Sequence, residues 1–340
     1  MGRYLAHSQD IARYHDVSQP LLDELISGGP DGCGVPFLVS DATADWPCME
    51  KWSFEWLRQQ FFDLEVSTSA SIDSEIQLRG KLGDYIDYIL DEEQHRNPIP
   101  RGFIYANPDH AKSRPLETQA VATPQYLVAW DLESIPHIAD DFPQPYFMKD
   151  RNLLDTLLPE ARETLFNKHT WVFVGPKGSL SELHNDHDHV HTYIAQVTGR
   201  KHFILFSPAY AGELAETDHL GHTLSGTGVN PLAPDLSRFP TFHSIPCYEC
   251  TLEPGDLLFL PASWLHWAQG LEAGITVSKD SVDRLNFGAW FQSMFVDKLP
   301  NYMLRIINKS PQSINAKARQ WIEAANASHL TEDLQYILER

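Results

Sequence analysis

The sequence predicts a mainly β protein with helical additions at both ends, and three observations lead to this fold class. From about residue 169 the chain reads as short strand-like segments separated by turn residues. Before that point, helix-like and strand-like segments alternate, and residues 296–340 return to the apolar spacing of helices. Many short strands with turn signals favour a barrel or a sandwich over a parallel α/β sheet.

The composition fits a folded protein and limits its partners. The 340 residues, 42% of them hydrophobic, suit one large domain or at most two smaller ones. Acidic residues outnumber basic ones by 46 to 26, and the resulting net charge of −20 disfavours nucleic acids and anionic membranes as partners. The N-terminus lacks a signal-peptide core, and no apolar run approaches the roughly 18 residues of a membrane span. We therefore expect a cytoplasmic protein, or a nuclear one in a eukaryote.

Residues 1–168 are predicted to form a helical and strand-containing module that packs on the barrel. Ser18 and Ser53 are helix-capping residue types that precede amphipathic segments, and Gly28 ends the first of these. The expected elements are helices at Leu21–Ile26, Ser53–Phe61 and Leu82–Ile89, a strand at Val35–Val39, and a long surface loop at Asn97–Pro124.

Residues 169–295 are predicted to form the barrel. Thr198–Arg200 provides a tight hairpin between two of its strands. The segment near residues 209–243 has little periodicity, so we expect an insertion over one rim that contacts substrate. The C-terminal helices at 296–340 pack on the barrel or form a homodimer interface. The expected strands are Thr170–Val174, His191–Val197, Lys201–Phe206, Tyr248–Leu252, Asp256–Leu260, Gly274–Ser278 and Phe287–Phe291.

Two histidines and an aspartate are the candidate metal ligands. His184 and Asp186 are two residues apart, so on an extended segment both side chains project to one face. A redox-active iron site needs imidazoles and a hard carboxylate on one face, with neighbouring coordination positions left open. The third ligand must come from a distant strand, and His266 follows a turn and the apolar strand that ends at Leu260. Cys247 and Cys250 form a lone CxxC, which we interpret as two buried thiols rather than a zinc site.

These motifs resemble those of a known family. The HxD at 184–186, the hairpin that leads to Lys201 and the PxxWxH run at 261–266 resemble the JmjC and cupin-like 2-oxoglutarate oxygenases. Within these the chain looks most like the branch with the asparaginyl hydroxylase that acts on hypoxia-inducible factor. The resemblance covers roughly residues 30 to 295, including the approach to the first ligand at Gly178–His184. It implies a double-stranded β-helix, the jelly-roll barrel of cupins.

The resemblance also implies roles for individual residues. Fe(II) would bind His184, Asp186 and His266, and Lys201 would pair with the distal carboxylate of 2-oxoglutarate. Ser181, Thr192 and Tyr126 would contribute to the same cosubstrate site, although Tyr126 is equally consistent with a core tyrosine. Dioxygen would be the third reactant, and a C–H bond would be hydroxylated with succinate and carbon dioxide as co-products.

Two alternatives come from the run His187-Asp188-His189, which looks like a two-residue expansion of the family pattern. If the expansion precedes Thr192, that residue contacts the cosubstrate, whereas simple strand alternation favours Tyr193. A bulge at Gly199 would favour Thr192. On a regular strand His187, His189 and His191 would share a face opposite to that of the ligands. They would then start a multi-histidine cupin site, line the substrate entrance or face solvent.

The substrate is a protein or peptide side chain, or a small metabolite, and the sequence leaves this choice open. Asn286 precedes the last predicted strand and is a further candidate for the site. Two other functions compete with the oxygenase: a cupin metalloenzyme that needs no cosubstrate, and a non-catalytic barrel that binds ligands.

Overall fold

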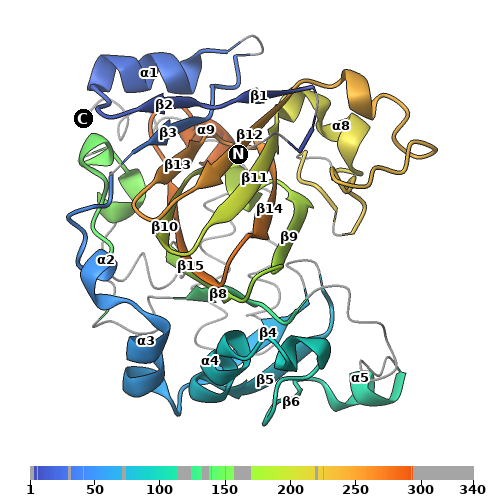
Figure 1. Cartoon of the computed structure of the whole chain (residues 1–340). Coiled ribbons are helices and arrows are strands. Elements are labelled where there is room, and N and C mark those ends of the chain that lie inside the picture. Colours follow the sequence, from blue (N-terminus) through green and yellow to red (C-terminus); the bar gives the residue numbers. More distant parts are fainter. Residues whose placement is uncertain are drawn as a thin grey trace, which may run out of the picture.

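Two facing β-sheets form the centre of the molecule in the computed structural model (Figure 1). The structure describes residues 4–5, 7–29, 32–40, 42–70, 74–113, 124–131, 138, 140–149, 151–156, 170–218, 221–224, 226–291 and 293. The larger sheet has the order β2 (Ala12–Tyr14), β3 (Phe37–Val39), β13 (Leu257–Leu260), β10 (His191–Thr198), β15 (Gly274–Ser281), β8 (Thr170–Gly175) and β7 (Leu127–Asp131). The smaller has the order β1 (Ser8–Asp10), β12 (Cys247–Leu252), β11 (Lys201–Phe206), β14 (Leu265–Gly270) and β9 (Leu180–His184). The predicted mainly β, jelly-roll fold with helical additions is confirmed.

Helices and a third sheet surround this barrel. The third sheet has the order β4 (Glu65–Ser69), β5 (Gln77–Lys81) and β6 (Ile104–Tyr105). The α-helices are α1 (Gln19–Ser27), α2 (Pro47–Lys51), α3 (Phe54–Phe61), α4 (Leu82–Leu90), α5 (Pro108–Ser113), α8 (Ala211–Leu214) and α9 (Phe287–Phe291). The short 3₁₀ helices are η1 (Gln94–Arg96), η4 (Tyr146–Met148), η5 (Leu153–Thr156), η6 (His187–His189), η7 (Pro208–Tyr210) and η8 (Phe242–Ser244). As predicted, the hydroxyls of Ser18 and Ser53 accept hydrogen bonds from the first turns of α1 and α3.

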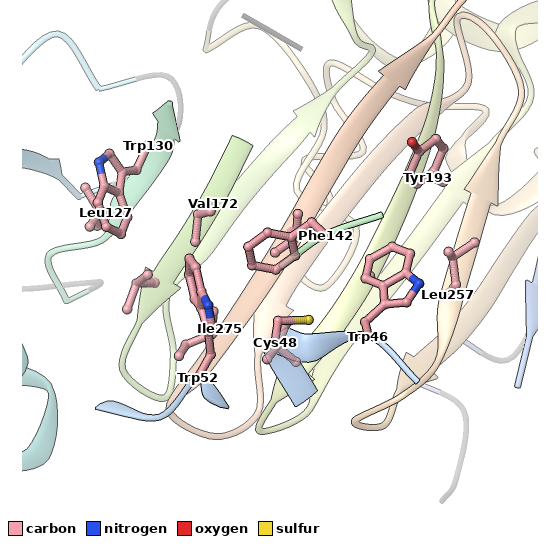
Figure 2. Packing of buried hydrophobic residues seen from close by; sticks show 14 of the residues in the cluster. Trp46, Cys48, Trp52, Leu127, Trp130, Phe142, Val172, Tyr193, Leu257 and Ile275 are labelled. Carbon is pink, nitrogen blue, oxygen red and sulfur yellow. The ribbon is translucent and has the colours of Figure 1, made fainter. Parts of the chain in front are cut away.

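Both faces of the two barrel sheets are covered by apolar clusters, which explains why many barrel strands are apolar at consecutive positions. Along β11, Phe203 and Leu205 point between the sheets, whereas Ile204 and Phe206 pack under the 209–243 segment. The outer face of the seven-stranded sheet packs against the N-terminal helices. Figure 2 shows this cluster, in which Trp46 and Trp52 from the α2 region and strand residues such as Val172, Leu257 and Ile275 form one apolar core.

One predicted strand is wrong, because Phe287–Phe291 forms helix α9. The amide of Phe287 donates to the carbonyl of Asp283 and that of Trp290 to the carbonyl of Asn286, which is the i to i−4 pattern of a helix. The rings of Phe287 and Trp290 lie 5.7 Å apart and pack against Val282. Because the rings of Phe287 and Trp290, three residues apart, pack together against Val282, tertiary packing outweighs the strand propensity of these aromatic residues, and the run is helical.

The predicted loop at Asn97–Pro124 is wrong in its first half. Tyr105 of β6 pairs with Leu78 of β5, and Asn107 accepts a hydrogen bond from Asp109 at the start of α5. Residues 114–123 and the predicted helices at 296–340 lie outside the described residues. Within the described part of the chain, no helix is long and apolar enough to cross a membrane.

Candidate metal centre and cosubstrate cavity

A cavity of about 640 Å³ lies between the two sheets. Its side chains come from alternate positions of the strands, such as Trp171 and Phe173 of β8 and Thr276, Ser278 and Asp280 of β15. The intervening residues of β8 and β15 belong to the outer core, so strand alternation determines which side chains reach the cavity. The volume is that of a small-molecule site.

Strand pairing brings the three candidate ligands together at one end of this cavity. His184 of β9 lies opposite His266 of β14, and their rings are 4.1 Å apart between centroids. Asp186 follows β9 in an extended conformation, and its Oδ1 atom lies 4.0 Å from Nε2 of His184 and 3.8 Å from Nε2 of His266. Among the described residues, these three form one group whose donor atoms are close enough for a shared metal ion.

The hydrogen bonds of the two imidazoles fit metal ligands. Nδ1 of His184 lies 2.7 Å from the carbonyl oxygen of Glu182, and Nδ1 of His266 lies 3.2 Å from that of Trp264. Because a carbonyl oxygen only accepts hydrogen bonds, each Nδ1 carries the proton and each Nε2 presents its lone pair to the cavity. Two ligand atoms at about 2.1 Å from one ion are at most about 4.2 Å apart, so the observed separations are within its reach.

The carboxylate of Asp186 is held in its ionised form. Burial raises the pKa of this carboxyl, but the nearby His266 and His184 and a hydrogen bond from Thr192 lower it, and the net shift is downward. The Thr192 hydroxyl donates to Oδ2 of Asp186 over 2.5 Å. The other carboxylate oxygen, Oδ1, is the one that lies near His184 and His266. A hard anionic oxygen beside two imidazole nitrogens is the donor set of non-haem iron(II) oxygenases.

A β-bulge explains why Ser181 also lines the cavity. Ser181 and His184 are three residues apart, so on a regular strand they would face opposite sides. The register between β9 and β14 shifts between the His266–His184 pair and the Ala268–Ser181 pair, which inserts one extra residue into β9. Both side chains therefore reach the same cavity.

Lys201 is a buried cation at the cavity wall. It is 6% exposed, its Nζ atom donates to the hydroxyl of Tyr126 over 2.8 Å, and it lies over the rings of Phe173 and Phe203 at 5.1 and 5.6 Å. Burial lowers the pKa of the amine to about 7. Among the described residues no carboxylate pairs with it, so an anion that enters the cavity would supply the missing charge.

Tyr126 is fixed beside Lys201 by its backbone neighbours. Tyr126 pairs with Ser69 of β4, and the buried hydroxyl of Tyr85 accepts from the amide of Leu127 and contacts the carbonyl oxygens of Gln125 and Val174. Burial raises the pKa of the Tyr126 hydroxyl, although its hydrogen bond with Ser181 lowers it, and the tyrosine stays protonated. The structure thus brings Lys201, Ser181 and Tyr126 together.

Thr192, rather than Tyr193, lies at the candidate metal centre. Tyr193 points into the outer core, where its hydroxyl donates to Gln144. The Thr192 hydroxyl donates a hydrogen bond to Asp186 and does not line the cavity wall, so it contacts a candidate metal-binding residue. The register shift on β10 lies between Gln196 and Thr198, beside the positive-φ turn residue Gly199.

The expected alternation of His187, His189 and His191 on one strand face is wrong. Residues 187–189 form η6, and His189 and Asp188 have positive φ angles of 52° and 68°. His189 contacts the Ser263 hydroxyl at 2.8 Å, whereas His191 accepts from the amide of Ala262. His189 and His191 therefore point to different partners, and among the described residues none of the three imidazoles belongs to a metal-binding group.

Two other sequence candidates lie elsewhere. Asn286 bonds to the carbonyl oxygens of His189 and Ser281, so it supports η6 from behind and does not line the cavity. Cys247 packs on the outer face of β12 and Cys250 between the sheets, so the two thiols point in opposite directions. Burial raises the pKa of Cys247 to about 12. Both cysteines are buried thiols, as predicted.

Several cavity residues were missed by the sequence analysis. Phe203 and Ile194 line the cavity two positions beyond Lys201 and Thr192, so strand alternation was a signal for both. His222, which no motif in the sequence singled out, lines the cavity together with Asp218 from the 209–243 segment. That segment was predicted to contact substrate, but nothing in its spacing identified these side chains.

A jelly-roll barrel whose cavity brings two imidazoles and one carboxylate together has the architecture of the 2-His-1-carboxylate metalloproteins. The family model of the cupin-like domain matches residues 32–295, and the chain belongs to this family.

The sequence is similar to several named proteins. It is 25% identical over 249 residues to lysine-specific demethylase 8 of Xenopus tropicalis, covering 72% of this chain and 47% of that protein. It is 27% identical over 234 residues to tRNA wybutosine-synthesizing protein 5 of Danio rerio, covering 68% of this chain and 64% of that protein. It is 26% identical over 265 residues to the human bifunctional peptidase and (3S)-lysyl hydroxylase JMJD7, covering 72% and 76%. The chain thus spans about half of the first relative and less than two thirds of the second.

Proposed function

We propose that this protein is an Fe(II)- and 2-oxoglutarate-dependent oxygenase that hydroxylates an unactivated C–H bond. The observation that carries the proposal is the pairing, in one cavity, of the His184, Asp186 and His266 group with the buried amine of Lys201. A metal site alone fits many cupin enzymes. A buried cation in the same cavity fits a cosubstrate with one carboxylate at the metal and a second one at the lysine.

The residues of the chain bind and orient the reactants. His184, Asp186 and His266 would hold the iron, which supplies the oxidative chemistry with dioxygen when it is bound. Lys201 and the hydroxyls of Tyr126 and Ser181 would bind the distal carboxylate of 2-oxoglutarate. Phe173 and Phe203 cover the lysine. They would exclude water from the ion pair between Lys201 and the distal carboxylate, which would strengthen that pair. Thr192 keeps the Asp186 carboxylate in one orientation.

The substrate we propose is a protein or peptide side chain, or a small neutral or basic metabolite. The net charge of −20 disfavours a polyanion. Two of the similar proteins are named for modification of lysine, as a demethylase and as a lysyl hydroxylase. The resemblance to the asparaginyl hydroxylase branch likewise favours side-chain hydroxylation, although none of the similar proteins named above belongs by its name to that branch.

Succinate formation from 2-oxoglutarate by the iron-loaded protein tests the proposal. We expect turnover in the wild type, loss of turnover in Asp186→Ala, and a raised KM for 2-oxoglutarate in Lys201→Ala. Lys177→Ala, which removes an exposed lysine, is the matched control and should behave like the wild type. Equal turnover in the wild type and Asp186→Ala would refute the assignment. Metal binding that is indifferent to 2-oxoglutarate and to Lys201→Ala would instead indicate a cupin enzyme without cosubstrate.

A further inference from the structure

The middle residue of the HxD motif connects the candidate ligands to the 209–243 segment. Asn185 is 3% exposed and lies between His184 and Asp186. Its side-chain amide donates to the carbonyl oxygen of Gly221 over 2.9 Å, and its Oδ1 atom accepts from the amide of Thr223 over 2.9 Å. The Thr223 hydroxyl accepts from the backbone amide of Asn185 over 3.3 Å and lies 3.3 Å from Oδ1 of the same residue. One buried side chain thus satisfies backbone groups on both sides of residue 222.

The partner of Asn185 is a short hairpin, which we call the rim hairpin (Glu216–Asp218 and Gly221–Leu224). Thr217 and Thr223 form an antiparallel bridge, and the amide of Leu224 donates to the carbonyl of Glu216 over 2.7 Å. Within its described residues the amide of Asp218 also donates to the carbonyl of His222, and that of Gly221 to the carbonyl of Asp218, so backbone hydrogen bonds hold the hairpin together. Its docking against the HxD segment depends on the contacts of Asn185 and His222.

His222, at the centre of the rim hairpin, makes a second connection to the same segment. Its Nε2 atom accepts from the backbone amide of Asp188 over 3.2 Å, and its Nδ1 atom lies 3.3 Å from a carboxylate oxygen of Asp218. The ring of His222 lies 5.3 Å from that of His187 and 5.0 Å from that of His189. The left-handed backbone at Asp188 and His189 is therefore held by the hairpin as well as by its own turn.

The docked face of the rim hairpin is also a wall of the cavity. Asp218, His222, Thr223 and Leu224 line the cavity together with His184, Asp186 and His266. The side chains that would surround a substrate at the metal end therefore come partly from a hairpin whose place is determined by the HxD segment itself.

We propose that Asn185 is a positioning residue that locks the rim hairpin to the metal-ligand segment. Through this lock the hairpin holds His184 and Asp186 in register and forms the substrate-side wall of the cavity. The inference rests on the proposed function for its catalytic consequence, whereas the lock itself depends only on the hydrogen bonds above.

Amide hydrogen exchange and steady-state kinetics of the full-length protein test this inference. In Asn185→Ala, exchange in peptides spanning residues 216–227 should be about thirtyfold faster, the factor that corresponds to about 2 kcal/mol for two lost hydrogen bonds. Exchange in the barrel strand Lys201–Phe206 should stay within about twofold of the wild type. Asn185→Asp, which keeps the acceptor for Thr223 but places a second acceptor opposite the carbonyl oxygen of Gly221, should also accelerate exchange there. Asn230→Ala, which alters an exposed asparagine of the same segment, is the matched control.

The kinetic arm separates positioning from general destabilisation. At saturating iron, kcat for succinate formation by Asn185→Ala should fall about tenfold, the range seen when a group that orients metal ligands is lost. The KM for 2-oxoglutarate should stay within about twofold, because Lys201 is not part of the lock. Thr223→Val should reproduce these effects in part, and the double variant should add little to Asn185→Ala, as expected for two residues that act through one contact.

Unchanged exchange of the rim hairpin, or equal acceleration throughout the barrel, would overturn the inference. If the wild type forms no succinate, the proposed function fails, and Mn(II) affinity replaces the kinetic arm. A Mn(II) dissociation constant raised about tenfold in Asn185→Ala, together with fast local exchange, then supports the lock. An unchanged dissociation constant contradicts it.

Discussion

Replacing Lys201 by methionine should stabilise the cofactor-free protein and at the same time weaken 2-oxoglutarate binding. Methionine has a similar length and no charge, so it fits the aromatic surroundings of Phe173 and Phe203. The lysine, in contrast, is buried without a carboxylate partner among the described residues, and burial lowers its pKa from the ordinary 10.5 to about 7. At about 1.4 kcal/mol per pKa unit, this shift corresponds to a ceiling of about 5 kcal/mol of lost stability.

The pH dependence follows from the sign of this shift. Below about pH 7 the amine is charged in both the folded and the unfolded chain, so the wild type carries the full destabilisation. Between about pH 7 and 10.5 the unfolded chain binds more protons, so the stability of the wild type rises with pH. The gain from Lys201→Met should therefore be largest near pH 6.5 and should decline towards pH 10.

Thermal unfolding and calorimetry measure the two effects. Without 2-oxoglutarate, Lys201→Met should have a higher Tm than the wild type at pH 6.5, by several degrees, and a smaller excess at pH 9.5. With 2-oxoglutarate and Mn(II), the loss of one charged hydrogen-bonding partner, at about 1.5–3 kcal/mol, should weaken binding by roughly 10- to 150-fold. A variant that is equally destabilised at both pH values, or that binds 2-oxoglutarate like the wild type, would refute the reasoning.

Three further substitutions test the neighbouring contacts. Thr192→Val removes the hydrogen bond to Asp186 without changing the side-chain shape, so Mn(II) affinity or kcat should fall about 10- to 100-fold with an unchanged Tm, measured by titration and turnover. Tyr126→Phe removes a hydroxyl bonded to Lys201, and the KM for 2-oxoglutarate should rise about tenfold with little change in kcat. Tyr85→Phe leaves the amide of Leu127 and two carbonyl oxygens without their buried partner, so chemical denaturation should show a loss of about 1–3 kcal/mol.

The fold and the candidate ligands were accessible from the sequence because they depend on local spacing. His184 and Asp186 share a face wherever the segment is extended. The apolar strand that ends at Leu260 indicated where in the chain to look for the third ligand, His266. Lys201 begins β11 after a hairpin turn, but its direction into the cavity was expected from the resemblance to the oxygenase family and not from spacing. The HxD pair and the turn before β11 need only the chain near the residues themselves.

The features that the sequence did not reveal depend on contacts between distant segments. Ser181 was expected at the cosubstrate site only from the family resemblance, because it reaches the cavity through a bulge that exists only in the pairing of β9 with β14 and that strand alternation does not predict. The course of the chain through Asp188 and His189 depends on a hydrogen bond from the amide of Asp188 to His222, more than thirty residues away. The run at Phe287–Phe291 was interpreted as a strand because its aromatic residues favour strands, whereas tertiary packing of Trp290 made it a helix.

A crystal structure with Mn(II) and 2-oxoglutarate tests the central claim most directly. Our account predicts one metal ion bound by Nε2 of His184, Nε2 of His266 and a carboxylate oxygen of Asp186, with one end of 2-oxoglutarate on the metal and the other carboxylate on Nζ of Lys201. A metal ion bound by His189 or His191, or 2-oxoglutarate bound away from Lys201, would contradict it.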